Sequence, residues 1–150
     1  MKGRPTRLLW LMALPAIGLV AFLTACGGGE TKEVKVSLRE WSVTPDVAQM
    51  KSGDVRFVVT NDGTEPHELV IIRSDLSLEA LPVVAGKVTE DAVDIIDEVE
   101  PFAAKATERK TVDLEAGRYI LICNIVENVP GQPVESHYEK GMRTAFTVTE

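Results

Sequence analysis

The sequence contains very few of the side chains that bind metals or act as nucleophiles. Among its 150 residues there are two cysteines, two histidines and four methionines. A chain this poor in histidine has none to spare for the several histidine-rich centres of multi-metal enzymes, and it has too little cysteine for a disulfide scaffold. No glycine-rich loop stands between a strand and a helix, which excludes a phosphate-cradling site of that kind. The positions of the few remaining candidates therefore carry most of the functional information.

The first 25 residues have the composition of an export signal. Three basic residues precede an apolar run over residues 8–23, which is short for a membrane span and has the flanks of a signal. Residues 23–26 place small side chains before Cys26 and resemble the lipobox of bacterial lipoproteins. This resemblance implies cleavage before Cys26 and lipid attachment to its sulfur. A plain secretory signal and an uncleaved transmembrane anchor are the alternatives.

The expected signal divides the chain into three segments and indicates the cellular location of the protein. We expect a signal peptide over residues 1–25, a lipidated flexible tether over 26–32 and one folded domain over 33–150. The domain would be lipid-anchored to a bacterial membrane, on its extracytoplasmic side. Because lipid consumes Cys26, Cys123 has no intramolecular partner. It is then a buried inert thiol, an intermolecular bridge, or a reactive or metal-bound thiolate.

The exported part of the chain is strongly acidic. All 23 acidic residues, but only 13 of the 16 basic ones, lie after residue 25, which leaves a formal net charge of about −10. Such a surface disfavours nucleic acid and favours a basic partner in a salt-dependent way, although solubility alone is the simpler explanation. The length fits one domain with its own core, and we expect a monomer.

Apolar residues recur with the period of strands along most of the domain. Residues 34–38 and 55–59 alternate as half-buried strands do, whereas 69–72 and 119–123 are continuous apolar runs typical of buried strands. A final strand is expected over residues 142–149. About seven short strands separated by turn signals predict an all-β fold, an antiparallel Greek-key β-sandwich.

Two local patterns refine this prediction. The alternation changes parity before Trp41, which indicates a bulge or bend near Glu40. The spacing Leu114-x-x-Gly117-x-Tyr119 resembles the tyrosine corner of Greek-key sandwiches, in which the phenolic hydroxyl bonds to nearby backbone.

Residues 74–104 interrupt the strand pattern. Ala92, Ile95, Ile96 and Val99 recur at helical spacing, with Thr89 as a cap and Pro101 as a stop. We therefore expect an acidic insertion that contains a short helix and packs on one side of the sheet.

Four potential metal ligands stand at the ends of predicted strands. His67 precedes the run 69–72, Cys123 ends the run 119–123, and His137 and Met142 follow before the last strand. One thiolate, two imidazoles and one thioether form the ligand set of a blue-copper site. Each has a simpler explanation alone: a capping or surface histidine, a buried thiol, a loop histidine and a core methionine. Their joint placement favours one site.

The chain resembles the cupredoxins, the family of plastocyanin and azurin, and in particular their bacterial lipoprotein members. The resemblance lies in Pro66-His67, in Tyr119-x-x-x-Cys123-Asn124 and in the segment His137-x-x-x-Gly141-Met142. It implies one mononuclear type 1 copper whose ligands are His67, Cys123, His137 and Met142. The loop from Cys123 to His137 is longer than in familiar members, and Glu68 stands where many have asparagine.

The resemblance implies a membrane-tethered protein, not an enzyme, that carries single electrons between redox partners outside the cytoplasmic membrane. A copper carrier or sensor without electron transfer is one alternative. A metal-free β-sandwich that acts as an interaction module of a membrane complex is another. A hydrolase that uses Cys123 and His137 is disfavoured, because the sequence has no oxyanion-hole motif. A structural zinc site is disfavoured too, because it would have more thiolates or histidines and no thioether.

Overall fold

The computed structural model describes residues 31–150. The predicted signal peptide over residues 1–25, the lipid site at Cys26 and most of the predicted tether over 26–32 lie outside this part of the chain. Among the described residues, no helix has the length and apolar character that a membrane crossing requires.

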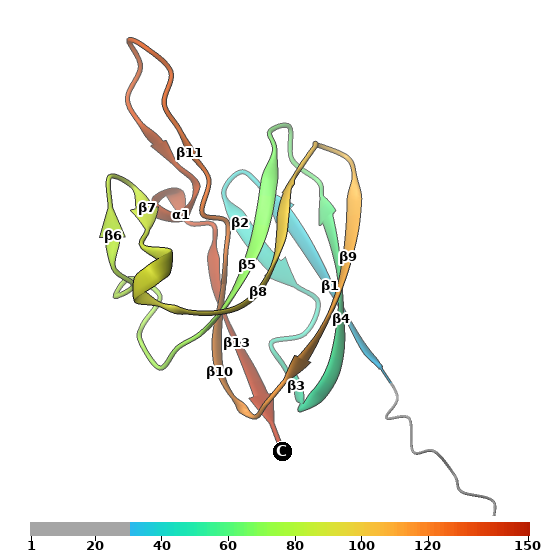
Figure 1. The fold of residues 1–150 in the computed structure, drawn as a ribbon. Coiled ribbons are helices and arrows are strands. Elements are labelled where there is room, and N and C mark those ends of the chain that lie inside the picture. The colour runs from blue at the N-terminus through green and yellow to red at the C-terminus, as the bar shows by residue number, and fades with distance from the viewer. Residues whose placement is uncertain (1–30) are drawn as a thin grey trace, which may run out of the picture.

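Two sheets stacked face to face form the molecule, and two short hairpins lie beside them (Figure 1). The first sheet has the order β2-β1-β4-β9, with bounds β1 Lys32–Arg39, β2 Ser42–Pro45, β4 Gly53–Asn61 and β9 Thr107–Leu114. The second has the order β3-β13-β10-β5-β8, with bounds β3 Gln49–Lys51, β5 His67–Arg73, β8 Asp94–Phe102, β10 Gly117–Ile122 and β13 Arg143–Thr149. The hairpins are β6 Val83–Val84 with β7 Lys87–Val88, and β11 Val126–Glu127 with β12 Glu135–Ser136.

The predicted all-β sandwich is confirmed, with one difference in strand direction. The β1–β4 and β3–β13 pairs are parallel, so both large sheets are mixed and not wholly antiparallel as expected. The predicted tyrosine corner is also present, because the Tyr119 hydroxyl donates to the Glu115 carbonyl at 2.8 Å. The expected bend near Glu40 is a tight reversal between β1 and β2, and the Glu40–Trp41 peptide bond within it is cis.

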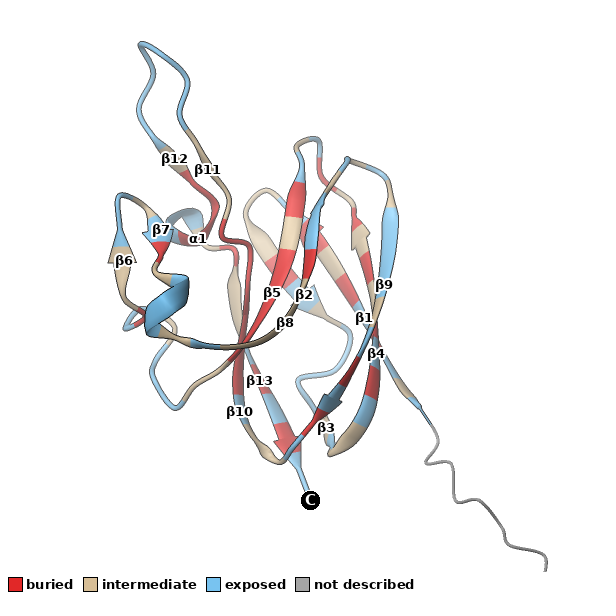
Figure 2. Cartoon of the chain, viewed as in Figure 1, coloured by how far each residue is buried: buried red, intermediate tan, exposed pale blue. Residues whose placement is uncertain are grey.

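The main core lies between the two sheets and explains the alternating strands. Alternate side chains over residues 34–38 of β1 and 55–59 of β4 are buried there. Phe57 meets Phe146 of the opposite sheet edge to face, with ring centroids 6.0 Å apart. Figure 2 shows this alternation as bands of buried and exposed residues along the strands.

The continuous apolar runs of β5 and β10 are buried on both faces. One face of each strand lies in the main core, through residues such as Leu69 and Leu121. The other face carries Val70 and Ile122 into a second apolar cluster, which residues 78–95 and Tyr138 complete. The insertion is therefore needed to cover the outer face of the second sheet.

The prediction of a helix within residues 74–104 is wrong. Only one turn of 3₁₀-helix forms, at Glu90–Ala92, and the segment after it is the edge strand β8. The pairing of β8 with β5 shifts register between Ile71 and Ile72. Ile95 packs in the second cluster, and the extra residue at the shift lets Ile96 and Val99, three positions apart, both pack in the main core. A bulged strand with apolar residues on both faces can produce the same spacing as one face of a helix.

Candidate metal centre

Three of the four predicted ligands converge at one end of the sandwich. His67 begins β5, Cys123 follows β10, and His137 begins the single-turn helix α1, His137–Lys140. The two imidazole Nδ1 atoms are 3.2 Å apart, and the Cys123 Sγ atom lies 3.3 Å from Nδ1 of His137 and 3.9 Å from Nδ1 of His67. All three side chains are fully buried. Both imidazoles thus present the same ring nitrogen to the sulfur.

The backbone after Cys123 holds His137 and Met142 beside that cysteine. The Cys123 N–H donates to the Met142 carbonyl, and the Met142 N–H donates to the His137 carbonyl, both at 3.0 Å. The Ser136 hydroxyl caps α1 by accepting from the Glu139 N–H at 3.1 Å. Gly141 ends the turn with φ +124°, a conformation that side chains with a Cβ rarely adopt.

The long spacing between Cys123 and His137 is accommodated by the β11–β12 hairpin. This hairpin extends away from the sandwich at the same end as the metal centre (Figure 1). Val126 pairs with Ser136 at its base, and the His137 N–H donates to the Ile125 carbonyl at 3.0 Å. The extra residues therefore do not separate Cys123 from His137, because the chain leaves the sandwich and returns to it at adjacent points.

Met142 is fully buried and belongs to the same apolar cluster as Cys123. Its backbone bonds to Cys123 and His137 place it next to the three converging side chains. The assignment of its thioether as the axial ligand stays a prediction.

Burial sets the protonation of all three donors. It raises the pKa of the Cys123 thiol to about 11, and it lowers the pKa of His137 to about 4, with a further lowering from His67. Burial also lowers the pKa of His67, although Glu40 opposes that effect. At neutral pH both imidazoles are uncharged and each has a lone pair for a metal, whereas the thiol must lose its proton when a metal binds.

Glu68 ties the two ligand segments together. Its Oε1 atom accepts the N–H of Asn124, the residue after Cys123, at 2.9 Å. Burial raises the pKa of Glu68 to about 7, because it outweighs the opposing effect of that hydrogen bond. Asn124 itself is buried and bonds to the N–H and carbonyl of Val88, at 2.7 and 3.0 Å, which fastens the insertion to the cysteine loop.

The far nitrogen of each imidazole faces a glutamate. Nε2 of His67 lies 3.2 Å from Oε1 of Glu40, and Nε2 of His137 lies 3.8 Å from Oε2 of Glu65. Within residues 31–150, the Glu65 and His137 atoms of the second pair are the two buried side-chain polar atoms without a hydrogen-bond partner. Neither glutamate could be recognised from the sequence as part of the site, and the change of parity near Glu40 was the only local signal at either position.

The donor set fits a single type 1 copper site. A soft sulfur and two imidazole nitrogens converge in a dry, fully buried position, and a second sulfur-containing side chain is buried beside them. His67, Cys123 and His137 would hold the metal, and Met142 is the candidate for a fourth ligand. A copper ion there would supply one-electron redox chemistry, while the sandwich fixes its ligands.

Comparison with known proteins supports the same class of fold. No family model matches the sequence, and no curated protein matches it. Among solved structures, it is similar to the auracyanin of Roseiflexus castenholzii, with a TM-score of 0.56 and 17% identity over 81% of this chain and 100% of that one. It is also similar to auracyanin A, a blue copper protein of Chloroflexus aurantiacus, with a TM-score of 0.52 and 19% identity over 80% of this chain and 100% of that one.

A rusticyanin is a further structural neighbour, with a TM-score of 0.50 and 20% identity over 81% of each chain. These neighbours are cupredoxins, and the chain therefore has the cupredoxin fold. The resemblance that the sequence indicated is confirmed at the level of the fold, together with the His67–Cys123–His137 cluster.

Proposed function

We propose that this protein binds one copper ion and carries single electrons between redox partners, and that it is not itself an enzyme. The observation that carries this proposal is the convergence of two imidazole nitrogens and one cysteine sulfur within 4.8 Å of one another. Electron transfer is fast when the ligands move little between oxidation states. Buried side chains fixed by strand ends and backbone hydrogen bonds meet that requirement.

Metal content and redox cycling test the proposal directly. Purified protein should contain one copper per chain and should be reduced by dithionite and reoxidised repeatedly without losing metal. A protein that keeps its copper but cannot be reduced and reoxidised reversibly would favour a copper carrier or sensor. Equal thermal stability with and without copper would favour a metal-free interaction module. The full burial of all three donors supports retention of the metal, because a carrier must release it.

We also propose that Cys26 carries lipid and tethers the domain outside the cytoplasmic membrane. The position of β1 supports this arrangement, because β1 begins at the end of the sandwich opposite the metal centre (Figure 1). A tether at that end would leave the metal centre facing away from the lipid surface. Substitution of Cys26 by serine should release the protein from membranes into the soluble fraction. A variant that stays membrane-bound would contradict the lipid assignment.

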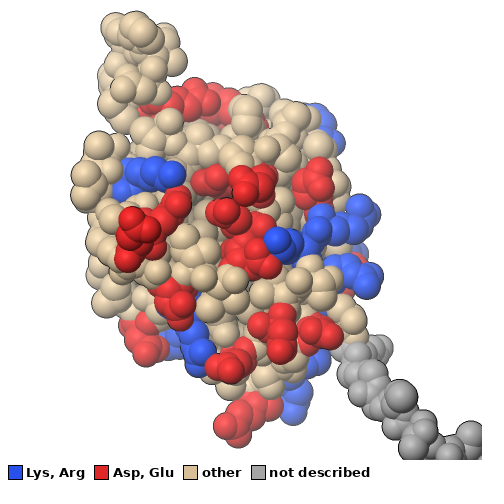
Figure 3. Space-filling view, in the orientation of Figure 1, with Lys and Arg blue, Asp and Glu red and all other residues tan. Residues whose placement is uncertain are grey.

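The redox partner is proposed to present a basic face. Acidic side chains gather on the face that carries β8 (Figure 3), and β8 alone contributes Asp94, Asp97, Glu98 and Glu100. Such a surface attracts cations over about one Debye length, about 8 Å at physiological salt. Electron transfer with a cationic cobalt or ruthenium complex should therefore slow as salt is added, whereas transfer with ferricyanide should accelerate. Equal salt dependence for both reagents would contradict this proposal.

A further inference from the structure

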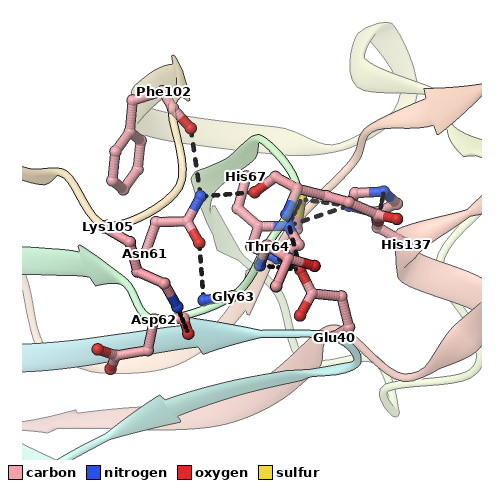
Figure 4. A network of polar contacts seen from close by, with 11 residues as sticks. Glu40, Asn61, Asp62, Gly63, Thr64, His67, Phe102, Lys105 and His137 are labelled. Carbon is pink, nitrogen blue, oxygen red and sulfur yellow. Dashed lines mark hydrogen bonds and ion pairs between the residues drawn. The ribbon is translucent and has the colours of Figure 1, made fainter.

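The carboxylate of Glu40 occupies a position built by the turn that leads to His67. Its Oε1 atom accepts the N–H groups of Thr64 and Glu65 at 2.7 and 2.9 Å and lies 3.2 Å from Nε2 of His67 (Figure 4). Glu40 stands between β1 and β2 of the first sheet, whereas His67 begins β5 of the second. One oxygen atom therefore connects a ligand segment of one sheet to the other sheet.

The turn is shaped to leave room for this oxygen. A Cβ atom at Gly63 would lie 2.4 Å from Oε1 of Glu40, so the carboxylate fits only because residue 63 is glycine. Asn61 holds the turn in place, since its Oδ1 atom accepts the Gly63 N–H at 3.0 Å and its Nδ2 atom donates to the Glu65 carbonyl at 2.7 Å. These contacts orient two backbone N–H groups toward one acceptor.

The same contacts keep Glu40 ionised. Two backbone N–H groups donate to one carboxylate oxygen, and such hydrogen bonds favour the ionised form because a carboxylate accepts them more strongly than a neutral acid does. An ionised carboxylate only accepts hydrogen bonds, so Nε2 of His67 is the atom that carries the ring proton. Nδ1 of His67 then presents its lone pair to Cys123 and His137.

We propose that Glu40 is a positioning residue of the metal centre, which fixes the tautomer of His67 and, through that imidazole, lowers the reduction potential of the bound metal. The proposal rests on the proposed copper site. A negative charge one imidazole away from the metal favours the oxidation state of higher charge, and burial reduces the screening of that interaction. Glu40 therefore stabilises Cu(II) relative to Cu(I).

Two substitutions distinguish this electrostatic role from simple support of the turn. Glu40→Gln removes the charge but keeps an oxygen that can accept the same three hydrogen bonds. Gly63→Ala keeps the charge but displaces the carboxylate, and the φ of Gly63 is compatible with alanine. Asp62→Asn is the matched control, because Asp62 lies in the same turn but bonds to Ser37 and contacts Arg39, away from the metal centre.

The midpoint potential is measured by redox titration of copper-loaded, full-length protein. Glu40→Gln should lower the ratio of Cu(II) to Cu(I) affinity about tenfold, which raises the potential by about 59 mV for one electron. Gly63→Ala should also raise the midpoint potential, and Asp62→Asn should change the potential much less. A Glu40→Gln shift no larger than that of Asp62→Asn, or a shift to lower potential, would overturn the electrostatic role.

Nuclear magnetic resonance of the metal-free, full-length protein tests the tautomer without copper. ¹⁵N-edited spectra should show His67 protonated on Nε2, with a strongly hydrogen-bonded proton whose resonance moves upfield in Glu40→Gln. A proton on Nδ1 in the unmodified protein would overturn the positioning role. A protein that binds no copper would end the proposed function and the electrostatic role together, whereas this spectrum would still decide the role of Glu40 toward His67.

Discussion

At the scale of single residues, the metal centre depends on side chains that water cannot reach. Cys123, His67 and His137 are fully buried, and burial favours the uncharged form of each. A bound cation changes that balance, because it compensates the negative charge of the thiolate. The site is therefore best explained by a metal ion that binds a thiolate strongly in a position without water.

Cys123→Ser should abolish the intense visible absorption of the copper protein. The hydroxyl cannot provide sulfur-to-copper charge transfer, and it is a poor ligand for Cu(I). The fold should remain, because serine is close to cysteine in size and a buried hydroxyl costs only about 1–3 kcal/mol. Visible and circular-dichroism spectra, with chemical denaturation, measure both effects. Retention of the colour would contradict the ligand assignment, and gross unfolding would indicate a packing role.

Met142→Leu should keep the colour and shift the potential. Leucine preserves most of the buried volume of Met142, so the loss of stability should stay below about 1.5 kcal/mol. An axial thioether is a weak ligand that tunes the potential without being needed for binding. Redox titration of the copper-loaded variant measures the shift. Complete loss of copper, or an unchanged potential, would contradict the axial assignment.

The three converging donors and the candidate Met142 could be predicted from the sequence, whereas the groups that orient them could not. His67, Cys123, His137 and Met142 occur next to apolar runs whose role as strands is visible in the residue pattern. The bond between Glu40 and His67 depends on the parallel pairing of β1 with β4, which brings Leu38 beside Asn61. No local pattern reveals such a pairing, because β2 and β3 separate the two segments along the chain.

At the scale of elements, the insertion is part of the core and not an appendage. It covers the outer face of β5 and β10, and Asn124 joins it to the cysteine loop through three hydrogen bonds, the third to Glu90 at 3.1 Å. The outer face of these strands would otherwise expose Val70, Ile72, Ile120 and Ile122 to water. The insertion therefore contributes to the rigidity of the strand end that carries the thiol.

Asn124→Ala should loosen the insertion. The N–H and carbonyl of Val88 would lose their partner in a buried position, at a cost of about 1–3 kcal/mol in the free energy of unfolding. Asn128→Ala, at an exposed residue of the β11–β12 hairpin, is the control and should change stability by less than about 0.5 kcal/mol. Urea denaturation compares them. Equal stability of the two variants would show that Asn124 does not hold the insertion.

The elements also show where residue patterns mislead. The runs 69–72 and 119–123 predicted strands correctly, because continuous β-branched and aliphatic residues are common in strands buried on both faces. In β8 a register shift puts Ile96 and Val99, three residues apart, on the same face, and this spacing imitates a helix. The apolar spacing was assigned the period of a helix, whereas the segment is an edge strand paired with β5.

At the scale of the whole molecule, one end of the sandwich carries the metal centre and the other carries the start of β1 (Figure 1). The donors come from β5, the end of β10 and α1, which are held together only in the folded state. Copper that binds this arrangement must therefore stabilise the entire domain. The stabilisation approaches about 4 kcal/mol when free metal exceeds the dissociation constant a thousandfold, if the unfolded chain does not bind it.

The melting temperature should accordingly rise when Cu(II) is added to metal-free protein. Cys123→Ser is the matched control and should show a much smaller increase, because it lacks the sulfur ligand. Scanning calorimetry at several copper concentrations measures the effect. An increase of equal size in both proteins would show that the metal binds elsewhere on the acidic surface.

The presence of one copper site is measured most directly by the visible spectrum of metal-free, full-length protein during titration with Cu(II). A copper ion shared by the three donors should give an intense absorption band from sulfur-to-copper charge transfer, which grows linearly and stops at one equivalent. A pale solution with no such band, or a band that fails to saturate at one copper per chain, would show that His67, Cys123 and His137 do not share a single copper ion.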